Sequence, residues 1–337
     1  TSKSTSKNRS TSAIAMTILP LNPAENASPD ALLAFLGECR AAASRDGRAK
    51  LVSISLAVDA LDPLAVLESI FEPDEPHFYT ERPASDTAIA GAEIALAHET
   101  QGANRFTEVK EWMEETLRHT IAVGDVSAPF GGPHFFAGFA FHDEVGAEEP
   151  FPAAFAFVPR WQVALAGKTT TAVANLLVAP DADLAGLAQR VWRAHQKFRG
   201  FRYGAAAGVE GEQPGPTRFT TREAGDYRAA VGRALGRIEA GEFSKIVLAR
   251  AQDLTADRPL HPLRMLNGLR QRFPDCYAFS FAHGRGPSFI GASPERLVRV
   301  SKGRLETEAL AGSIRRGAGA SEDAGLASAL LRSEKDQ

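Results

Sequence analysis

The stretch KIVLAR at residues 245–250, together with FIGASPERL at residues 289–297, says most about how this chain folds. Residues of KIVLAR alternate between two faces, which predicts a strand that begins at Lys245. Pro294 has no N–H to donate to a ladder, so Glu295 is expected at a bend from which its side chain can enter a cleft. A lysine and a carboxyl group placed in this way can act as opposed base and acid across one small molecule.

The surroundings of this pair would set its chemistry. Apolar neighbours on the Lys245 side of the strand would lower the pKa of the ammonium toward a value useful to a general base. Apolar walls around Glu295 would keep its carboxyl group protonated near neutral pH, as a general acid requires. Taken alone, each residue has a simpler interpretation, since lysines at strand edges are usually solvated and surface glutamates are common. The specific signal is the combination of motifs.

A run of small residues follows the pair, within ETEALAGSIRRG at residues 306–317. Ala311, Gly312 and Ser313 are small enough to let backbone amides approach a ligand, and they are the candidate substrate-binding residues. The glycine spacing is not that of a phosphate loop, and the eight histidines form no HExxH-type metal pair. The sequence therefore favours a small-molecule site without a bound nucleotide.

Strand-like and helix-like segments surround these motifs without a fixed repeat. LVSISLAV at residues 51–58 alternates apolar and hydroxyl residues, as a half-buried strand does. Residues 155–180 predict a hairpin with a Gly-Lys turn, and residues 276–290 predict a second hairpin. A loop rich in Gly and Pro at residues 204–217 is expected to separate two structural halves.

Composition excludes several classes of protein. With 337 residues, 44% of them hydrophobic and 23% charged, the chain can bury a large core. A formal net charge of −3 gives no reason to expect a nucleic acid or a membrane surface as partner. Two cysteines, Cys39 and Cys276, are too few for a disulfide framework, and no apolar run is long enough to span a bilayer. We therefore expect a cytoplasmic protein, with residues 1–16 as a flexible tail.

The order and separation of KIVLAR, FIGASPERL, ETEALAGS and LLRSEKD resemble those of chorismate-utilising enzymes. The chain looks like an isochorismate synthase, within the larger group that includes anthranilate, aminodeoxychorismate and salicylate synthases. The resemblance is strong over residues 241–337 and diffuse before them. It implies the α+β fold of anthranilate synthase component I (ADC synthase-like), with two large stacked β-sheets, helices outside and the active-site cleft between the sheets. It also implies a single catalytic domain over residues 17–337.

The resemblance also assigns roles to the motif residues. Lys245 would activate a water molecule to attack C2 of chorismate, while Glu295 would protonate the departing C4 hydroxyl group. Gly312 and Ser313, next to Ala311, would contact a substrate carboxylate through the backbone. Ammonia-using relatives usually carry glutamine at the position of Lys245, so lysine favours the water-using branch. The expected activity is that of an isomerase, acting as a monomer or homodimer.

Magnesium is the cofactor that the resemblance implies, since Mg²⁺ binds carboxylates and would anchor the dianionic substrate. The glutamates that would hold the ion are expected beyond Gln337, one of them in an EH pair shortly after SEKD. None of the expected metal ligands is therefore predicted within the given chain, which we expect to be incomplete at its C-terminal end.

Two alternatives remain open from the sequence. A salicylate synthase would share Lys245 and Glu295 and add the elimination of pyruvate. A non-catalytic chorismate-fold binding protein, or an inactive fragment, would use neither residue in chemistry. The sequence also leaves open whether the product enters menaquinone or siderophore and salicylate biosynthesis.

Overall fold

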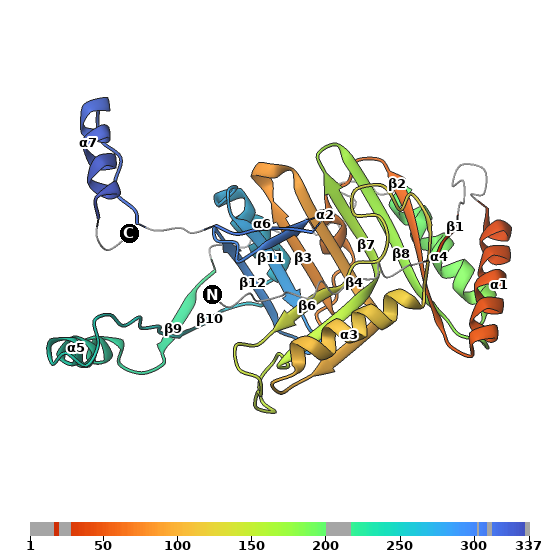
Figure 1. Cartoon of the computed structure of the whole chain (residues 1–337), viewed down its shortest axis with the longest axis horizontal. Coiled ribbons are helices and arrows are strands. Elements are labelled where there is room, and N and C mark those ends of the chain that lie inside the picture. Colours follow the sequence, from red (N-terminus) through yellow and green to blue (C-terminus); the bar gives the residue numbers. More distant parts are fainter. Residues whose placement is uncertain (1–16, 20–27, 200–216, 302, 309–311, 334–337) are drawn as a thin grey trace, which may run out of the picture. The chain divides into compact units, whose positions relative to one another are not determined.

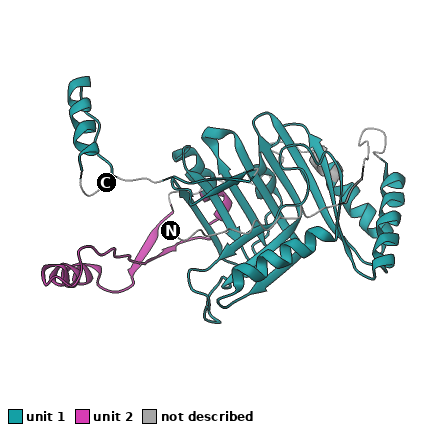
Figure 2. Cartoon of the chain, in the orientation of Figure 1, with its two compact units in different colours: residues 1–201, 266–337 teal, residues 202–265 magenta. Residues whose placement is uncertain are grey.

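The chain divides into two compact units, which Figure 2 distinguishes by colour. Residues 1–201 and 266–337 form the large unit, and residues 202–265 form the small unit. The computed structural model in Figure 1 describes residues 17–19, 28–199, 217–301, 303–308 and 312–333. The predicted tail at residues 1–16 lies outside the described residues, as does the predicted loop at residues 204–217 except for Thr217. The single domain over residues 17–337 stays a prediction.

A ten-stranded mixed sheet is the centre of the large unit. Its strands are β1 (Thr17–Leu19), β2 (Lys50–Val58), β3 (His77–Arg82), β4 (Thr87–Thr100), β5 (Thr120–Gly124), β6 (Phe136–Phe139), β7 (Ala154–Ala166), β8 (Thr169–Val178), β11 (Tyr277–Ala282) and β12 (Ser288–Ser293). The strand order is β1-β5-β2-β8-β7-β4-β3-β11-β12, and β6 pairs with β7 outside this path. The pairs β1/β5 and β2/β5 are parallel, and the other pairs are antiparallel.

The remaining elements surround this sheet or belong to the small unit. The helices are α1 (Pro29–Asp46), α2 (Pro63–Ser69), α3 (Arg105–Arg118), α4 (Leu184–Arg199), α5 (Tyr227–Glu239), α6 (Pro262–Arg272) and α7 (Ala320–Leu331), with a 3₁₀ turn η1 (Pro83–Ser85). Two separate ladders pair β9 (Phe219–Glu223) with β10 (Gln252–Ala256) and β13 (Arg299–Ser301) with β14 (Arg304–Glu306). Of the two large sheets expected, the described residues therefore contain one. No helix in this part of the chain is both long and apolar enough to cross a membrane.

Local sequence explains why several elements begin and end where they do. Ser28 caps α1 by accepting a hydrogen bond from the backbone N–H of Ala31, and Pro29 fits the first helical turn. Gly47 ends α1 in the left-handed region, with φ of 63°. The Gly-Lys turn joins β7 to β8, and Gly167 there also has a positive φ of 59°. Both predicted hairpins and the strand at residues 51–58 are confirmed.

The core lies between the sheet and its helices. In Figure 1, α3 lies in front of the sheet and α4 lies behind it. Buried apolar side chains of α1, α4, β2, β5 and β8 form one cluster: Phe35, Leu36, Cys39, Val52, Ile121, Val123, Leu176, Val178, Leu184 and Ala188. An aromatic cluster contains Ile89, Phe136, Phe155, Phe157 and Ala164. β7 is buried along nearly its whole length, as expected for a central strand covered on both faces.

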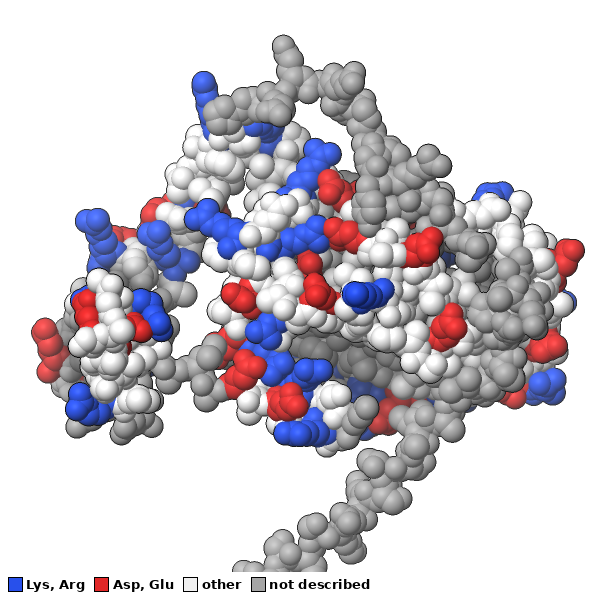
Figure 3. Space-filling view, turned by 90° about the horizontal axis from the view of Figure 1, so that it is seen from above, with Lys and Arg blue, Asp and Glu red and all other residues white. Residues whose placement is uncertain are grey.

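On the face that Figure 3 shows, basic and acidic side chains of the described residues lie interspersed. This distribution agrees with the near balance of 38 basic and 41 acidic residues.

Candidate active site

Glu295 is the second residue after β12, at the bend that the sequence predicts. Ser293 ends the strand, and Pro294 follows with no N–H for a ladder. The hydroxyl group of Ser293 donates to the carbonyl oxygen of Glu295 at 3.2 Å, which fixes the backbone of the bend. The Glu295 side chain is exposed, so the described residues do not supply the apolar walls expected around it.

Lys245 does not begin a strand, and this sequence prediction is wrong. Residues 245–250 have no regular secondary structure, and β10 begins only at Gln252. Lys245 is exposed, and its neighbour Val247 is 84% exposed. The physical reason is that alternation predicts which side chains share a face, whereas a strand also needs a partner for its N–H and C=O groups. Among the described residues, no strand pairs with residues 245–250.

The two members of the predicted pair belong to different units. Lys245 lies in the small unit and Glu295 in the large unit. Their opposed arrangement across a substrate therefore stays a prediction. What the structure does place is the relation of the Glu295 bend to Thr307 and Glu308, at the start of the motif, since hydrogen bonds join them within the large unit.

The candidate substrate-binding residues are only partly described. Ala311 lies outside the described residues, whereas Gly312 and Ser313 are both exposed. Gly312 has a φ of 72°, a left-handed conformation that a residue with a Cβ adopts only at a cost. The glycine is thus required by the backbone at this position, which agrees with an amide presented to a ligand.

No metal site is formed by the part of the chain that the structure describes, in which no three His, Cys, Asp or Glu side chains converge as ligands. The position of the magnesium ligands stays a prediction.

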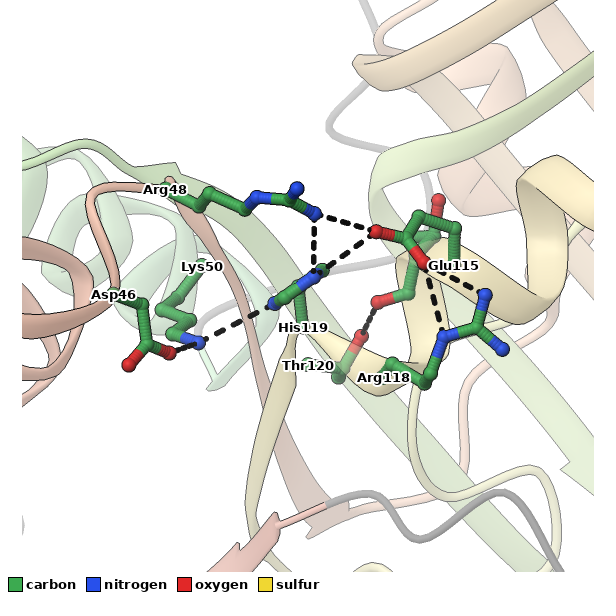
Figure 4. Close-up of polar contacts among 8 residues, drawn as sticks. Asp46, Arg48, Lys50, Glu115, Arg118, His119 and Thr120 are labelled. Carbon is green, nitrogen blue, oxygen red and sulfur yellow. Dashed lines mark hydrogen bonds and ion pairs between the residues drawn. The ribbon is translucent and has the colours of Figure 1, made fainter. Parts of the chain in front are cut away.

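One polar cluster that sequence reasoning missed joins the ends of α1 and α3 (Figure 4). Lys50 is largely buried and forms an ion pair with Asp46, and its Nζ lies 3.4 Å from Nδ1 of His119. Nε2 of His119 lies 3.1 Å from a carboxylate oxygen of Glu115, which also binds Arg48 at 2.7 Å. A hydrogen bond from Lys50 lowers the pKa of Asp46. Because these charges pair with one another, the cluster is a structural link between the helices.

A second missed cluster lies where α6 meets α2 and β3. Arg270 Nη2 donates to Asp62 at 2.6 Å, and Nη1 donates to Asp62 at 3.0 Å and to Glu81 at 3.1 Å. The hydroxyl group of Tyr79 donates to Glu81. Burial by itself would raise the pKa of Asp62, but the hydrogen bonds and charge of Arg270 outweigh it, so this pKa lies below its usual value. Residues 62 and 270 are 208 positions apart, so no local pattern could have predicted their contact.

A cavity of about 320 Å³ lies beside the end of β4. Its polar lining includes Glu99, Glu149 and Arg285, and Phe151 lies on its apolar side. Glu99 is engaged by His283, at 3.2 Å, and by Arg285, at 3.6 Å. None of the sequence-predicted site residues lines this cavity.

A protein-family model described as "Chorismate binding enzyme" matches residues 35–337 of the chain, which includes all four motifs. The chain belongs to this family. The resemblance to chorismate-utilising enzymes, which the sequence motifs indicated, is thereby confirmed at the level of the family.

Two curated members of the chorismate-binding family are similar over most of the chain. The "Salicylate biosynthesis isochorismate synthase" of Pseudomonas aeruginosa is 32% identical over 301 residues, which cover 86% of this chain and 59% of that protein. The isochorismate synthase MenF of Bacillus subtilis is 26% identical over 299 residues, which cover 86% of this chain and 62% of that protein. The chain thus spans about three fifths of the length of these relatives.

A solved structure of the same family shows the fold. MenF, the menaquinone-specific isochorismate synthase of Escherichia coli, matches with a TM-score of 0.58 at 19% identity, covering 90% of this chain and 65% of that chain. The expected α+β fold of the chorismate-binding enzymes is therefore confirmed.

Proposed function

We propose that the protein is an isochorismate synthase, which converts chorismate into isochorismate. One water molecule adds at C2, the ring double bonds shift, and the C4 hydroxyl group leaves as water once it has taken up a proton. Water is therefore neither gained nor lost in the net reaction, which makes the enzyme an isomerase. The observation that carries the proposal is the similarity of 86% of the chain to an isochorismate synthase, and the chain's own motifs supply a candidate base and a candidate acid.

Lys245 is the proposed general base and Glu295 the proposed general acid. Lys245 takes a proton from the attacking water molecule, and Glu295 gives a proton to the departing hydroxyl group at C4. General acid and base catalysis each contribute a factor of about 10² to 10⁴ to the rate. The backbone around Gly312 and Ser313 is proposed to bind a carboxylate of chorismate, which the left-handed conformation of Gly312 supports.

Magnesium is part of the proposal as the ion that anchors the dianionic substrate. Carboxylates of the protein and of chorismate are the ligands that this hard cation prefers. The proton transfers are assigned to Lys245 and Glu295, and the ion would contribute the binding of the substrate carboxylate. Removal of divalent cations by a chelator should abolish turnover, and added Mg²⁺ should restore it.

The test is product analysis of the full-length protein with chorismate and Mg²⁺. Isochorismate is the expected product, identified by chromatography and NMR. Lys245→Ala and Glu295→Gln should each lower kcat by about 10² or more while substrate binding stays measurable. Lys168→Ala, at the exposed β7–β8 turn, and Glu144→Gln, on an exposed loop, are matched controls that should keep wild-type rates.

Three outcomes would contradict parts of the proposal. Accumulation of salicylate and pyruvate would identify a salicylate synthase instead. Wild-type rates in Lys245→Ala or Glu295→Gln would remove the role assigned to that residue. Binding of chorismate without turnover by the intact wild-type protein would indicate a non-catalytic member of the family.

A further inference from the structure

The bend that carries Glu295 is tied to the segment that follows β14. The hydroxyl group of Thr307 donates to the carbonyl oxygen of Leu297 at 2.9 Å. One residue further along, Glu308 accepts a hydrogen bond from Arg296 Nη2 at 2.6 Å. Two contacts thus join the SPERL segment to the ETEALAGS motif, both at the open end of the short antiparallel β13–β14 ladder.

Arg296 is the centre of this link. Its side chain is only 18% exposed, although Glu295 next to it is exposed, so the two side chains enter different surroundings. Arg296 Nη1 also donates to the hydroxyl group of Tyr277 at 3.4 Å, on the neighbouring strand β11. Tyr277 is itself held by the guanidinium of Arg82, which lies 5.2 Å above its ring.

The geometry of a guanidinium makes this link a rigid one. Its donors lie in one plane, so partners at Glu308 and Tyr277 fix the direction of the group as well as its position. A hydrogen bond between an ionised donor and acceptor is about twice as strong as a neutral one. The bond at 2.6 Å is of this kind, with Arg296 18% exposed and Glu308 42% exposed. Anchoring Arg296 therefore restricts the backbone of Glu295, one peptide bond away.

We propose that Arg296 is the positioning residue for Glu295, and that its ion pair with Glu308 ties the acid-bearing bend to the first residues of the ETEALAGS motif. The role rests on the proposed function, since it assumes that Glu295 is the acid. A displacement of about 1 Å in a reacting group can cost about 10² in rate. Loss of the link should therefore lower kcat much more than it raises KM.

The test compares variants of Arg296 in the full-length protein. Arg296→Met should lower kcat about 10²-fold with KM changed less than threefold, because it removes the link but leaves the substrate contacts. Arg296→Lys keeps a cation for Glu308 but loses the planar fork, so kcat should recover to within about tenfold of wild type. Glu308→Gln, which keeps an acceptor of the same shape, should lie between wild type and Arg296→Met. Arg48→Met is the control, since its exposed ion pair has a similar length of 2.7 Å.

Hydrogen exchange measured by mass spectrometry supplies a readout that does not depend on turnover. In Arg296→Met, residues 294–298 and residues 304–308 should both exchange faster than in wild type, whereas Arg48→Met should change neither segment. Wild-type exchange in both segments, or an increase in KM at unchanged kcat, would overturn the proposal. If Arg296→Met does not fold, the kinetics and the hydrogen exchange of Glu308→Gln test the proposal in its place. A wild-type protein that forms no isochorismate would refute the proposed function, and exchange alone would then show whether Arg296 joins the two motifs.

Discussion

Replacing Arg270 by methionine is expected to lower the free energy of unfolding by about 3 kcal/mol at pH 7. The substitution keeps an apolar chain in place of the guanidinium stem but leaves Asp62 and Glu81 without their shared cation. Removing one partner of a buried ion pair costs about 3–5 kcal/mol. We take the lower end because the Asp62 side chain is 32% exposed, whereas Arg270 and Glu81 are 18% and 15% exposed.

The pH dependence gives the second half of this prediction. In the wild type, the pKa of Asp62 is lowered, so its stabilising contribution is present above the unfolded value of about 3.9 and is lost only as the pH falls through the folded pKa. Without Arg270, the burial of Asp62 is no longer opposed by the guanidinium, so the pKa of Asp62 should be raised. The variant should then gain stability relative to wild type as the pH falls from 7 to about 5.

Urea unfolding at pH 7 and pH 5 measures both quantities. Arg270→Lys keeps the positive charge but loses the planar set of donors that binds two carboxylates. It should lower the free energy of unfolding by about 1.5 kcal/mol, the value of one charged hydrogen bond. Arg160→Met is the control, because its ion pair with Glu93 is exposed and should be worth less than about 1 kcal/mol. A loss in Arg270→Met no larger than in the control, or a difference from wild type that grows toward pH 5, would refute the reasoning.

Two further predictions concern buried histidine and glycine. Burial lowers the pKa of His77 to about 4, so the free energy of unfolding of the wild type should fall by about 3 kcal/mol between pH 6.5 and pH 4. His77→Gln, whose side chain can still form a hydrogen bond with Ser280, should remove this loss. An equal loss in the wild type and the variant would contradict the assignment to His77. A Cβ at Gly124 would lie 2.1 Å from the carbonyl oxygen of Ser55, in a backbone with φ of 81°, so Gly124→Ala should cost more than about 2 kcal/mol. Gly37→Ala, in open space on α1, should instead stabilise by about 0.5–1 kcal/mol, and thermal melts of both variants would show whether the signs are opposite.

Much of the large unit could be predicted from local patterns. The strand at residues 51–58 and the two hairpins follow from alternation and from turn residues that accept a positive φ, such as Gly167. The bend at Glu295 follows from the proline before it. The strand predicted at residues 245–250 is absent because a strand needs a pairing partner, and nothing local in KIVLAR specifies which strand that would be.

The sequence by itself determined the family, the identity of the proposed base and acid, and the local elements whose hydrogen bonds close within a few residues. Only the tertiary structure decided that Arg270 binds Asp62 and that Arg296 joins its own bend to Glu308. These contacts depend on where the sheet brings β3, β11 and the following segments. A charged side chain can pair with any opposite charge within its reach, and the folded backbone alone sets which one that is.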